Sequence, residues 1–492
     1  MANSRLSEIR KIRLEKLVKL REMGIDPYPS KYSKSFIEIS KAKESLSKTV
    51  DVVGRLWRWR EHGNVIFADL RDASGQIQLL FQKKLLGDKY KLLKLFDSGD
   101  FLGVSGVVIK TQAGEITVDV SSFELLGKSI RPMPDSWEGL TDRETRYRRR
   151  YLDTNINPDV YQRFIRRSKF WEAHREFFKQ NDFIEINIPV LEHIPGGGDA
   201  NPFVTHMDAI DQDFYLRISQ ELYLKRLIGG GYEKVYEIGP RFRNEGLSDE
   251  HLPEHIAMEF YWAYADWQDG MKLIKELYKY VINYVYGDKK IFNIRGFKVD
   301  FSKDWEIIDF CEYINQKYDI DISKPNLKEI KKVLDTHKIK HDPNISIPRG
   351  VDILWKQLRT QIGGPAFLIN HPKYLSPLQK PSINNPNIVE RFQPIIGGSE
   401  LGNGWSEVND AIDQYERFSE QQKMREAGDK EAQWLDIDYV EMLEYGMPPT
   451  FGWGHSERLF WFLEDVTARE GVPFPQLKFE LDEVTKEIYG IK

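Results

Sequence analysis

The stretch RFRNEGLSDEHLPEHIAMEFYWAYADW, residues 241–267, decides the fold class because it joins two strand-like segments that are dense in opposed charges. Arg243 and Glu245 occupy alternate residues of the first expected strand, so we expect both side chains on one face. A loop containing His251 then leads to a second expected strand that carries Glu259. Because buried strands avoid unpaired charge, this density indicates either an ion-pair network or a ligand with charges of both signs.

Two further segments carry polar residues on strand-like backbone. Residues 446–465, GMPPTFGWGHSERLFWFLED, have the pattern of a strand that opens into an apolar helix, with Arg458 at the junction. Residues 392–410, FQPIIGGSELGNGWSEVND, form a glycine-rich strand region. The polar residues crowded into that region are Glu400, Asn403, Trp405 and Glu407. The sequence has no P-loop motif, so if the protein handles ATP, arginines and metal must hold the phosphates.

Length and charge indicate more than one domain. With 492 residues, of which 41% are hydrophobic and 13% aromatic, the chain is long enough for two or three folded domains. The net charge is −5, but residues 1–150 contain 29 Lys and Arg against 20 Asp and Glu, which gives +9 there and −14 in the remainder. A basic module joined to an acidic one suits an anionic polymer that is held by the first and modified by the second, with a merely solvated basic surface as the alternative.

The first part of the chain has the pattern of a small barrel. Residues 5–23 place apolar side chains at helical spacing and predict a helix. From residue 52 to 126, short alternating strands are broken by glycines, with one helical segment near 83–97. Five strands with a helix between the third and fourth predict an OB-type barrel, which often binds single-stranded nucleic acid. Candidate stacking and phosphate-binding side chains are Trp57, Trp59, Phe67, Arg55, Arg58 and Arg60.

The remaining chain predicts an α+β domain. Helical periodicity from about 159 to 180 leads into NDFIEINIPVL, a strand that ends at Pro189, and helices and strands alternate from there on. A segment rich in Lys, Ile and Asp at helical spacing indicates a helical insertion. The expected domains are an N-terminal helix and lead-in (1–50), an OB-fold domain (51–130), a linker (131–158) and the α+β domain (159–492) with its insertion at about 287–360.

The sequence also predicts a compartment. It has no run of about 18 apolar residues, and its N-terminal segment lacks the apolar core of a secretory signal. We therefore expect a cytoplasmic protein with no membrane partner. Cys311 is the only cysteine, which excludes internal disulfides and cysteine-based zinc clusters and fits a reducing compartment.

The charged segments, with the strand that ends at Pro189, resemble the three sequence motifs of the class II aminoacyl-tRNA synthetases. The segments IPGGGDANPFVTH, YLRISQELYLKRL and ELGNGWSEVNDAIDQYERF are similar to bacterial lysyl-tRNA synthetases in particular. The resemblance runs nearly end to end and includes the N-terminal helix and the OB module. It implies an antiparallel-sheet catalytic domain, an OB-fold that binds the anticodon, a homodimer, ATP and Mg²⁺ as cofactors, and tRNA(Lys) and L-lysine as partners.

The resemblance also implies residue roles. Arg243 would grip the amino acid carboxylate and the α-phosphate of ATP, Arg458 would hold the γ-phosphate, and both would be catalytic. The other ATP-binding residues would be Glu245, His251, His255 and Glu400, with Glu400 and Gln393 at the metal. The lysine-binding residues would be Gly197, Glu221, Glu259, Tyr261, Asn403, Trp405 and Glu407. The anticodon-binding residues would be Arg60, Phe67, Gln78 and Glu115.

The chain departs from the family pattern at the nucleotide end. His255 stands where the family usually has a phenylalanine that stacks on adenine, and a histidine can also protonate. Gln393 stands where the family commonly has a second magnesium-binding glutamate. The segment GWGHSER is one residue shorter before Arg458 than the usual form. These departures bear on affinity for ATP and metal, not on the expected reaction.

Three alternatives remain open at this point. An aspartyl- or asparaginyl-type synthetase shares the architecture but would place an arginine toward its substrate side chain, where this chain offers Glu407. A paralogue that lysylates a protein typically lacks the OB module. A catalytically weakened tRNA-binding paralogue is conceivable because of Gln393 and His255.

Overall fold

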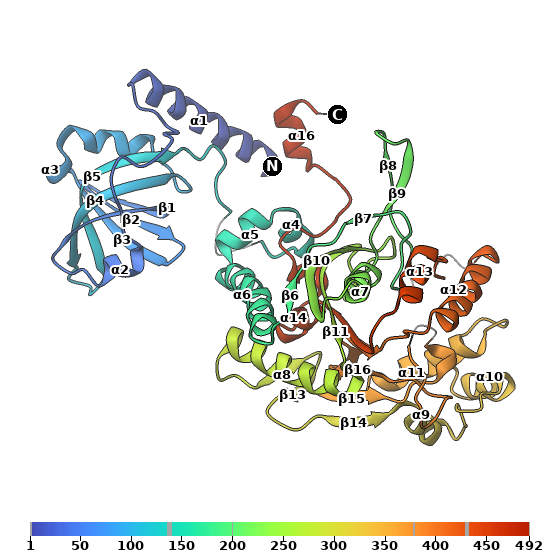
Figure 1. Ribbon diagram of the computed structural model, residues 1–492. Helices are drawn as coiled ribbons and strands as arrows, with labels where there is room; N and C mark the ends of the chain where they lie inside the picture. The colour runs from blue at the N-terminus through green and yellow to red at the C-terminus, as the bar shows by residue number, and fades with distance from the viewer. Residues whose placement is uncertain (1, 135–139, 199, 377–378, 429–431, 492) are drawn as a thin grey trace. The chain divides into compact units, whose positions relative to one another are not determined.

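The computed structural model describes residues 2–134, 140–198, 200–376, 379–428 and 432–491 (Figure 1). The chain divides into two compact units, of which the first comprises residues 1–142 and 478–492 and the second residues 143–477. Part of the expected linker, residues 135–139, lies outside the described residues.

The first unit is built around a closed barrel with strand order β1-β2-β3-β5-β4. Along β2, Ile66, Ala68 and Leu70 point into the barrel core, so the residues between them face outward. A helical segment separates β3 from β4, which confirms the predicted OB arrangement. The elements are α1 (Ala2–Glu22), α2 (Ile39–Lys43), β1 (Thr49–His62), β2 (Val65–Asp72), β3 (Gly75–Gln82), α3 (Lys83–Leu86), the 3₁₀ helix η1 (Gly87–Leu95), β4 (Phe101–Lys110), β5 (Ile116–Gly127) and α16 (Glu483–Tyr489).

Two of the expected stacking aromatics are buried or partly buried in the first unit. Trp57 is buried, and the guanidinium of Arg71 lies 4.2 Å from the centre of its ring. Trp59 packs against the barrel core, which it reaches because a register shift interrupts the pairing of β1 with β2 between Leu56 and Trp59. Without this bulge, the alternation along β1 would point Trp59 outward, and the bulge turns it toward the core. Of the three aromatics, only Phe67 remains on an outward position of β2.

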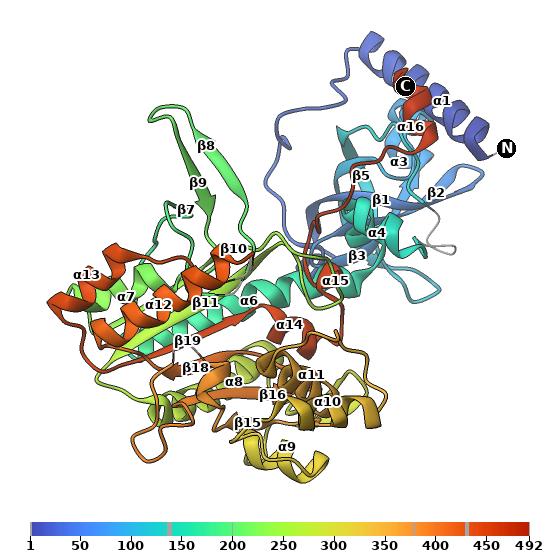
Figure 2. The ribbon, with the colours of Figure 1, turned by 90° about the vertical axis from the view of Figure 1, so that its right-hand side faces the viewer.

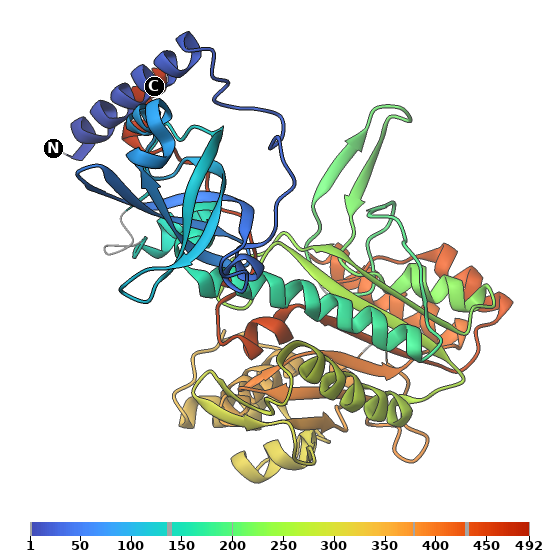
Figure 3. The same cartoon turned by 90° about the vertical axis from the view of Figure 1, so that its left-hand side faces the viewer.

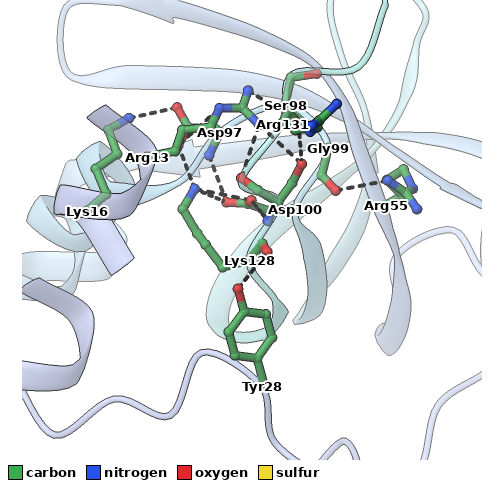
Figure 4. Close-up of polar contacts among 11 residues, drawn as sticks. Arg13, Lys16, Tyr28, Arg55, Asp97, Ser98, Gly99, Asp100, Lys128 and Arg131 are labelled. Carbon is green, nitrogen blue, oxygen red and sulfur yellow. Dashed lines mark hydrogen bonds and ion pairs between the residues drawn. The ribbon is translucent and has the colours of Figure 1, made fainter. Parts of the chain in front are cut away.

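A buried ion-pair network ties α1 to the barrel (Figure 4). The side chains of Lys128 and Asp100 have no exposed surface, and the Lys128 ammonium lies 2.9 Å from Asp100 and 2.5 Å from Asp97. From α1, Lys16 donates to Asp97 at 2.7 Å, and Arg13 donates to the backbone carbonyl of Ser98 at 3.0 Å. Each buried charge therefore has an opposite partner, as burial requires, and α1 is part of the first unit instead of a free arm.

The C-terminal helix α16 also belongs to the first unit, although the sequence assigned residues 478–492 to the α+β domain. It contacts α1, where the guanidinium of Arg10 lies 5.8 Å from the ring of Tyr489. Arg131 donates to the hydroxyl of Thr485 at 3.3 Å. The sequence of a short helix such as α16 does not show which of the two units the helix packs on. For this reason residues 478–492 were assigned to the wrong unit from the sequence.

The second unit contains one large sheet with strand order β14-β15-β16-β18-β19-β11-β10-β6, and β17 pairs with β16. The pairs from β15 to β10 are antiparallel, whereas β14 with β15 and β10 with β6 are parallel. The strands are β6 (Ile184–Glu185), β7 (Leu191–Glu192), β8 (Val204–Met207), β9 (Gln212–Leu216), β10 (Lys234–Phe242), β11 (Glu254–Ala263), β12 (Ile291–Ile294), β13 (Phe297–Asp300), β14 (Glu306–Asp309), β15 (Ala366–Ile369), β16 (Arg391–Ile396), β17 (Ser399–Glu400), β18 (Asn403–Ser406) and β19 (Thr450–Ser456).

The helices of the second unit lie around this sheet. Helix α6 packs along α8, and Figure 3 shows the two side by side. A three-stranded sheet, β7-β9-β8, stands apart from the large one, and Figure 2 shows β8 and β9 as a projecting hairpin. The helices are α4 (Arg143–Arg148), α5 (Arg150–Ile156), α6 (Pro158–Gln180), α7 (Glu221–Gly229), α8 (Trp267–Tyr286), α9 (Phe310–Tyr318), α10 (Leu327–Thr336), α11 (Ile347–Arg359), the 3₁₀ helix η2 (Lys373–Leu375), α12 (Ala411–Glu426), α13 (Ile437–Tyr445), α14 (Arg458–Leu463) and α15 (Ala468–Gly471).

Strand β11 shows how the two faces of the large sheet differ. Met258 and Phe260 belong to the aromatic core beneath α6 and α8. The alternate residues Glu259 and Tyr261 point to the opposite face, where Tyr261 packs with residues of α7. One face is therefore sealed by apolar packing, and the other carries the polar residues.

Three sequence expectations are corrected by the second unit. Residues 143–156 of the expected linker are helical, and the expected strand before Pro189 shrinks to the two residues of β6. The expected helical insertion begins with a hairpin, β12–β13, and with β14, which joins the large sheet. Arg295 and Gly296 both have positive φ, 51° and 86°, which suits a two-residue hairpin turn. Only 310–359 is mainly helical.

Across the described residues, no helix combines the length and apolar character needed to span a membrane.

Candidate active site

A cavity of about 440 Å³ opens on the polar face of the large sheet. Its walls come from β11, β16, β17, β18 and β19, from the loop after β10 and from the start of α14. Thirteen of the residues expected to bind ATP, metal or lysine line it: Gly197, Glu221, Arg243, Glu245, His251, His255, Glu259, Tyr261, Gln393, Glu400, Asn403, Trp405 and Arg458. The structure thus brings together segments that are far apart in the sequence.

The two expected catalytic arginines enter the cavity from different elements. Strand β10 ends at Phe242, so Arg243 and Glu245 lie on the loop beyond it and not on the strand as predicted. Nε of Arg243 donates to the backbone carbonyl oxygen of Ile218 at 3.5 Å. Arg458 lies at the start of α14, and one of its terminal nitrogens is 3.6 Å from a carboxylate oxygen of Glu250. Two guanidinium groups therefore converge on the same cavity.

Glu400 and Gln393, the expected metal ligands, are already engaged by the protein. Both oxygens of Glu400 accept hydrogen bonds, one from the Trp355 indole at 2.6 Å and one from Arg359. The amide oxygen of Gln393 lies 2.9 Å from Nε2 of His371. Within the described ranges, no three His, Cys, Asp or Glu side chains are grouped so that they could hold a metal ion. The donor set fits a metal held mainly by nucleotide phosphates, with one protein carboxylate, and does not fit a metal held by protein alone.

The two histidines at this end are neutral. Burial, together with the charges of Arg241 and Arg243, lowers the pKa of His255 to about 3. Burial and Arg458 likewise lower the pKa of His251, whose Nδ1 lies 2.8 Å from the hydroxyl of Ser248. His255 therefore does not protonate near neutral pH, and it offers an uncharged ring in place of a phenylalanine.

Glu259 is held by a network that the sequence did not reveal. Arg241 donates to one of its oxygens, and Ser219 donates to the same oxygen at 2.7 Å. The Tyr261 hydroxyl donates to the other oxygen at 3.2 Å. Arg241 lies on β10, two residues before Arg243, and also lines the cavity, but nothing in the sequence pairs it with Glu259.

Glu407 does not line the cavity within the described residues and is only 1% exposed. Its Oε2 lies 2.7 Å from the ammonium of Lys225, which also lies 2.7 Å from Oε1 of Glu221. Burial raises the pKa of Glu407 to about 7, although the charge of Lys225 opposes this shift. Lys225 was not singled out from the sequence. Its helical spacing from Glu221, four residues, was the available signal.

The four residues expected to bind an anticodon lie around Asp69 on the first unit. Arg60 pairs with Phe67 across β1 and β2, and Gln78 pairs with Asp69 across β2 and β3. Burial raises the pKa of Asp69, while Arg60 lowers it and Glu115 raises it, which places both charges close to Asp69. These outward-facing residues define what we call the Asp69 face: Arg60, Phe67, Asp69, Gln78 and Glu115.

Comparison with known proteins identifies the class. Residues 142–478 match the family model for tRNA synthetases class II (D, K and N), and residues 50–126 match an OB-fold nucleic acid binding domain. The chain belongs to the class II tRNA synthetases.

Curated relatives narrow the similarity further. The chain is 41% identical to the lysine–tRNA ligase of Fervidobacterium nodosum over 97% of its own length and 95% of the relative. It is also 41% identical to the lysine–tRNA ligases of Thermotoga maritima, over 98% and 99%, and of Carboxydothermus hydrogenoformans, over 97% and 99%.

Proposed function

We propose that this protein is a lysine–tRNA ligase, which uses ATP to attach L-lysine to tRNA(Lys) through a lysyl-adenylate. The similarity to lysine–tRNA ligases along nearly the whole chain carries this proposal. The cavity supports it, because carboxylates and arginines face a space large enough for small ligands. Lysine-dependent exchange of pyrophosphate into ATP, followed by charging of tRNA, tests both half-reactions.

Arg243 and Arg458 promote the first half-reaction, the formation of the lysyl-adenylate, by aligning lysine with ATP. Arg243 holds the lysine carboxylate against the α-phosphate, and Arg458 holds the γ-phosphate, so that a carboxylate oxygen attacks the α-phosphorus and pyrophosphate leaves. Glu245 and His251 contact the nucleotide, and the neutral ring of His255 stacks on adenine. Such a reaction needs positioning and neutralised charge more than a protein base. A terminal ribose hydroxyl of tRNA then attacks the lysyl carbonyl, and AMP leaves.

The opposite end of the cavity binds lysine. Glu221 and the backbone at Gly197 hold the α-amino group, and Tyr261, Asn403 and Glu407 hold the side-chain end. Glu259 completes the acidic wall, and Trp405 packs on the aliphatic stem. A carboxylate in a buried site is the group that a long cationic side chain requires.

Glu400 would be the protein ligand of a magnesium ion bound with ATP, and it would exchange a hydrogen bond from Trp355 or Arg359 for the ion. Such an ion would supply neutralisation of the phosphate charge, and the neutral amide of Gln393 would contribute no charge to holding it. Gln393→Glu is expected to lower the magnesium concentration needed for half-maximal pyrophosphate exchange, because it adds a carboxylate beside Glu400. A magnesium titration of wild type and variant measures this, with the KM for lysine as the control. An unchanged or higher requirement would contradict the role of Gln393.

The Asp69 face binds the anticodon. Phe67→Ala is expected to lower tRNA charging by one to two decades while leaving adenylate formation intact, because stacking of a base on an aromatic ring is worth about 1–3 kcal/mol. Phe101→Ala is a matched control, since Phe101 is an exposed phenylalanine on β4 that we do not assign to the anticodon. Equal charging of intact tRNA and of tRNA without its anticodon arm would refute the assignment.

The enzyme works as a homodimer in which the α6–β6 segment forms a two-fold, isologous contact. Apolar side chains of this segment are exposed, among them Ile165 and Ile184, each 40% or more. Light scattering at micromolar concentration is expected to give twice the 57.7 kDa of one chain. A mass of one chain under these conditions would rule the dimer out.

Of the alternatives, the aspartyl or asparaginyl type is the closest, since the matching family model covers D, K and N enzymes together. The OB-fold match argues against a paralogue that lacks this module. We place the enzyme in the cytoplasm because its substrate tRNA is used there.

A further inference from the structure

Lys225 is a buried cation fixed between two carboxylates of the lysine-binding end. Helix α7 places Glu221 and Lys225 one turn apart, so the two side chains lie on the same face. The ammonium of Lys225 is 2.7 Å from Glu221 and 2.7 Å from Glu407, and the lysine is 2% exposed. The protein therefore places an ammonium of its own at one oxygen of the carboxylate that we assign to the substrate ammonium.

The second oxygen of Glu407 has no such partner. In the described part of the chain, no group hydrogen-bonds to Glu407 Oε1, and this atom is buried. A Cβ added at Gly452 would lie 2.0 Å from Oε1 and 2.6 Å from Cε1 of Tyr261, so the oxygen and the Tyr261 ring, which lines the cavity, both lie against Gly452. A buried carboxylate oxygen without a donor is costly, and a ligand that brings a donor relieves that cost.

We propose that Lys225 sets the amino-acid specificity of the cavity by occupying Oε2 of Glu407, which leaves a single oxygen for the substrate's side-chain cation. An ammonium is a compact cation that pairs with a single carboxylate oxygen and directs its other two N–H groups to separate acceptors. A guanidinium is a planar fork that pairs best with both oxygens of a carboxylate. Lys225 thereby favours lysine over arginine without touching the substrate. This role rests on the proposed lysine–tRNA ligase function.

The charged groups around Glu407 indicate the same role for Lys225. Around Glu407 lie Glu221 and Lys225 on α7, Tyr261 on β11, Tyr439 on α13, and Trp405 on β18, and Lys225 is the cation among them. Burial raises the pKa of Glu407, and Lys225 is the first of the groups that lower it again. The Trp405 indole also lowers this pKa, although its N–H makes no hydrogen bond to a described group. Without Lys225, Glu221 and Glu407 would share one buried site with no counter-charge, and the pKa of Glu407 would rise further.

The test compares wild type and Lys225→Met in pyrophosphate exchange with L-lysine, L-ornithine and L-arginine. We expect the variant to lose about 100-fold in kcat/KM for lysine, mostly through KM, because one partner of a buried charge pair is gone. The ratio of kcat/KM for lysine to that for arginine should fall about tenfold or more, because both oxygens of Glu407 become available. In the variant, the KM for lysine should fall as pH rises from 7 to 9, since Glu407 must lose its proton to hold an ammonium. Wild type should show a much smaller change.

Arg226→Met is the matched control. Arg226 is the next residue of α7, and its ion pairs go to Asp436 and Asp438 instead of cavity residues. This variant should keep the wild-type preference for lysine over arginine. Equal losses of Lys225→Met for lysine, ornithine and arginine, without a pH-dependent KM, would overturn the proposal. No exchange of wild type with lysine would instead overturn the proposed function itself.

A second variant keeps the test decisive if Lys225→Met does not fold. Gly452→Ala places a methyl group against the free oxygen of Glu407 and leaves Lys225 in place. It should raise the KM for lysine about tenfold or more and change the KM for ATP by less than about twofold. An unchanged KM for lysine in a folded Gly452→Ala variant would show that the substrate does not use this oxygen and would overturn the proposal.

Discussion

Replacing Arg243 with methionine is expected to lower kcat/KM for adenylate formation about 10³-fold. The guanidinium is proposed to touch both reacting groups, so its loss removes alignment as well as the positive charge that balances the transition state. Removing a single preorganised donor typically costs about 10²–10³ in rate, and catalytic arginines in phosphoryl transfer contribute about 10³–10⁵. Pyrophosphate exchange at saturating lysine and ATP gives kcat, and titration of each substrate gives its KM.

Arg243→Lys distinguishes charge from geometry. It keeps the positive charge but offers a point donor in place of a planar fork, so it should recover only a small part of the lost activity. Circular dichroism and thermal unfolding serve as controls for folding. A rate within about tenfold of wild type for Arg243→Met would show that the residue is not the catalytic arginine, since such a change is below what one donor usually contributes.

Substrate choice should be the second large effect, with lysine preferred over aspartate by about 10⁴-fold or more. Among the residues assigned to this end of the cavity and their ion-pair partners, the carboxyl groups of Glu221, Glu259 and Glu407 outnumber the two cations, Arg241 and Lys225. The remaining negative charge matches the side-chain ammonium of lysine and repels the carboxylate of aspartate. Ornithine should be the nearest competitor, because one methylene is worth only about 1–3 kcal/mol.

Glu407→Gln isolates the charge in this selection. The variant keeps the shape of the side chain and is expected to raise the KM for lysine far more than the KM for ATP, since the buried Lys225 and the substrate ammonium then share one carboxylate fewer. Exchange with each of the twenty amino acids is the measurement. Robust exchange with aspartate or asparagine and none with lysine would replace the proposed function with that of the related enzyme types.

Sequence patterns predicted the barrel and an α+β domain because burial repeats every two residues along a strand, whereas the antiparallel sheet of that domain was implied by the family resemblance. Met258 and Phe260 against Glu259 and Tyr261 show the alternation clearly. The patterns failed where local signals compete. The hairpin at 291–300 lies in the segment 287–360, which is rich in Lys, Ile and Asp and was taken for a helical insertion, although the Arg-Gly turn of the hairpin marks a reversal of the chain.

The residues of the candidate active site also divide into those that the sequence predicted and those that it did not. Motif-bearing residues such as Glu221 and Trp405 were predicted, and the structure brings them to one cavity. Their partners were missed, because Arg241, Lys225 and Arg359 meet their carboxylates only after folding. Ion pairs between distant segments leave no periodic trace in a single sequence. For the same reason, the engagement of Glu400 by Trp355 could not be expected.

The packing of α16 on α1 has a consequence for the order in which the molecule is completed. A ribosome makes α1 long before α16, and the whole of residues 143–477 is synthesised between them. The contact of Tyr489 with Arg10 can therefore form only after that entire stretch has left the exit tunnel. The barrel is among the first parts to be translated, yet the unit that contains it is among the last to be finished.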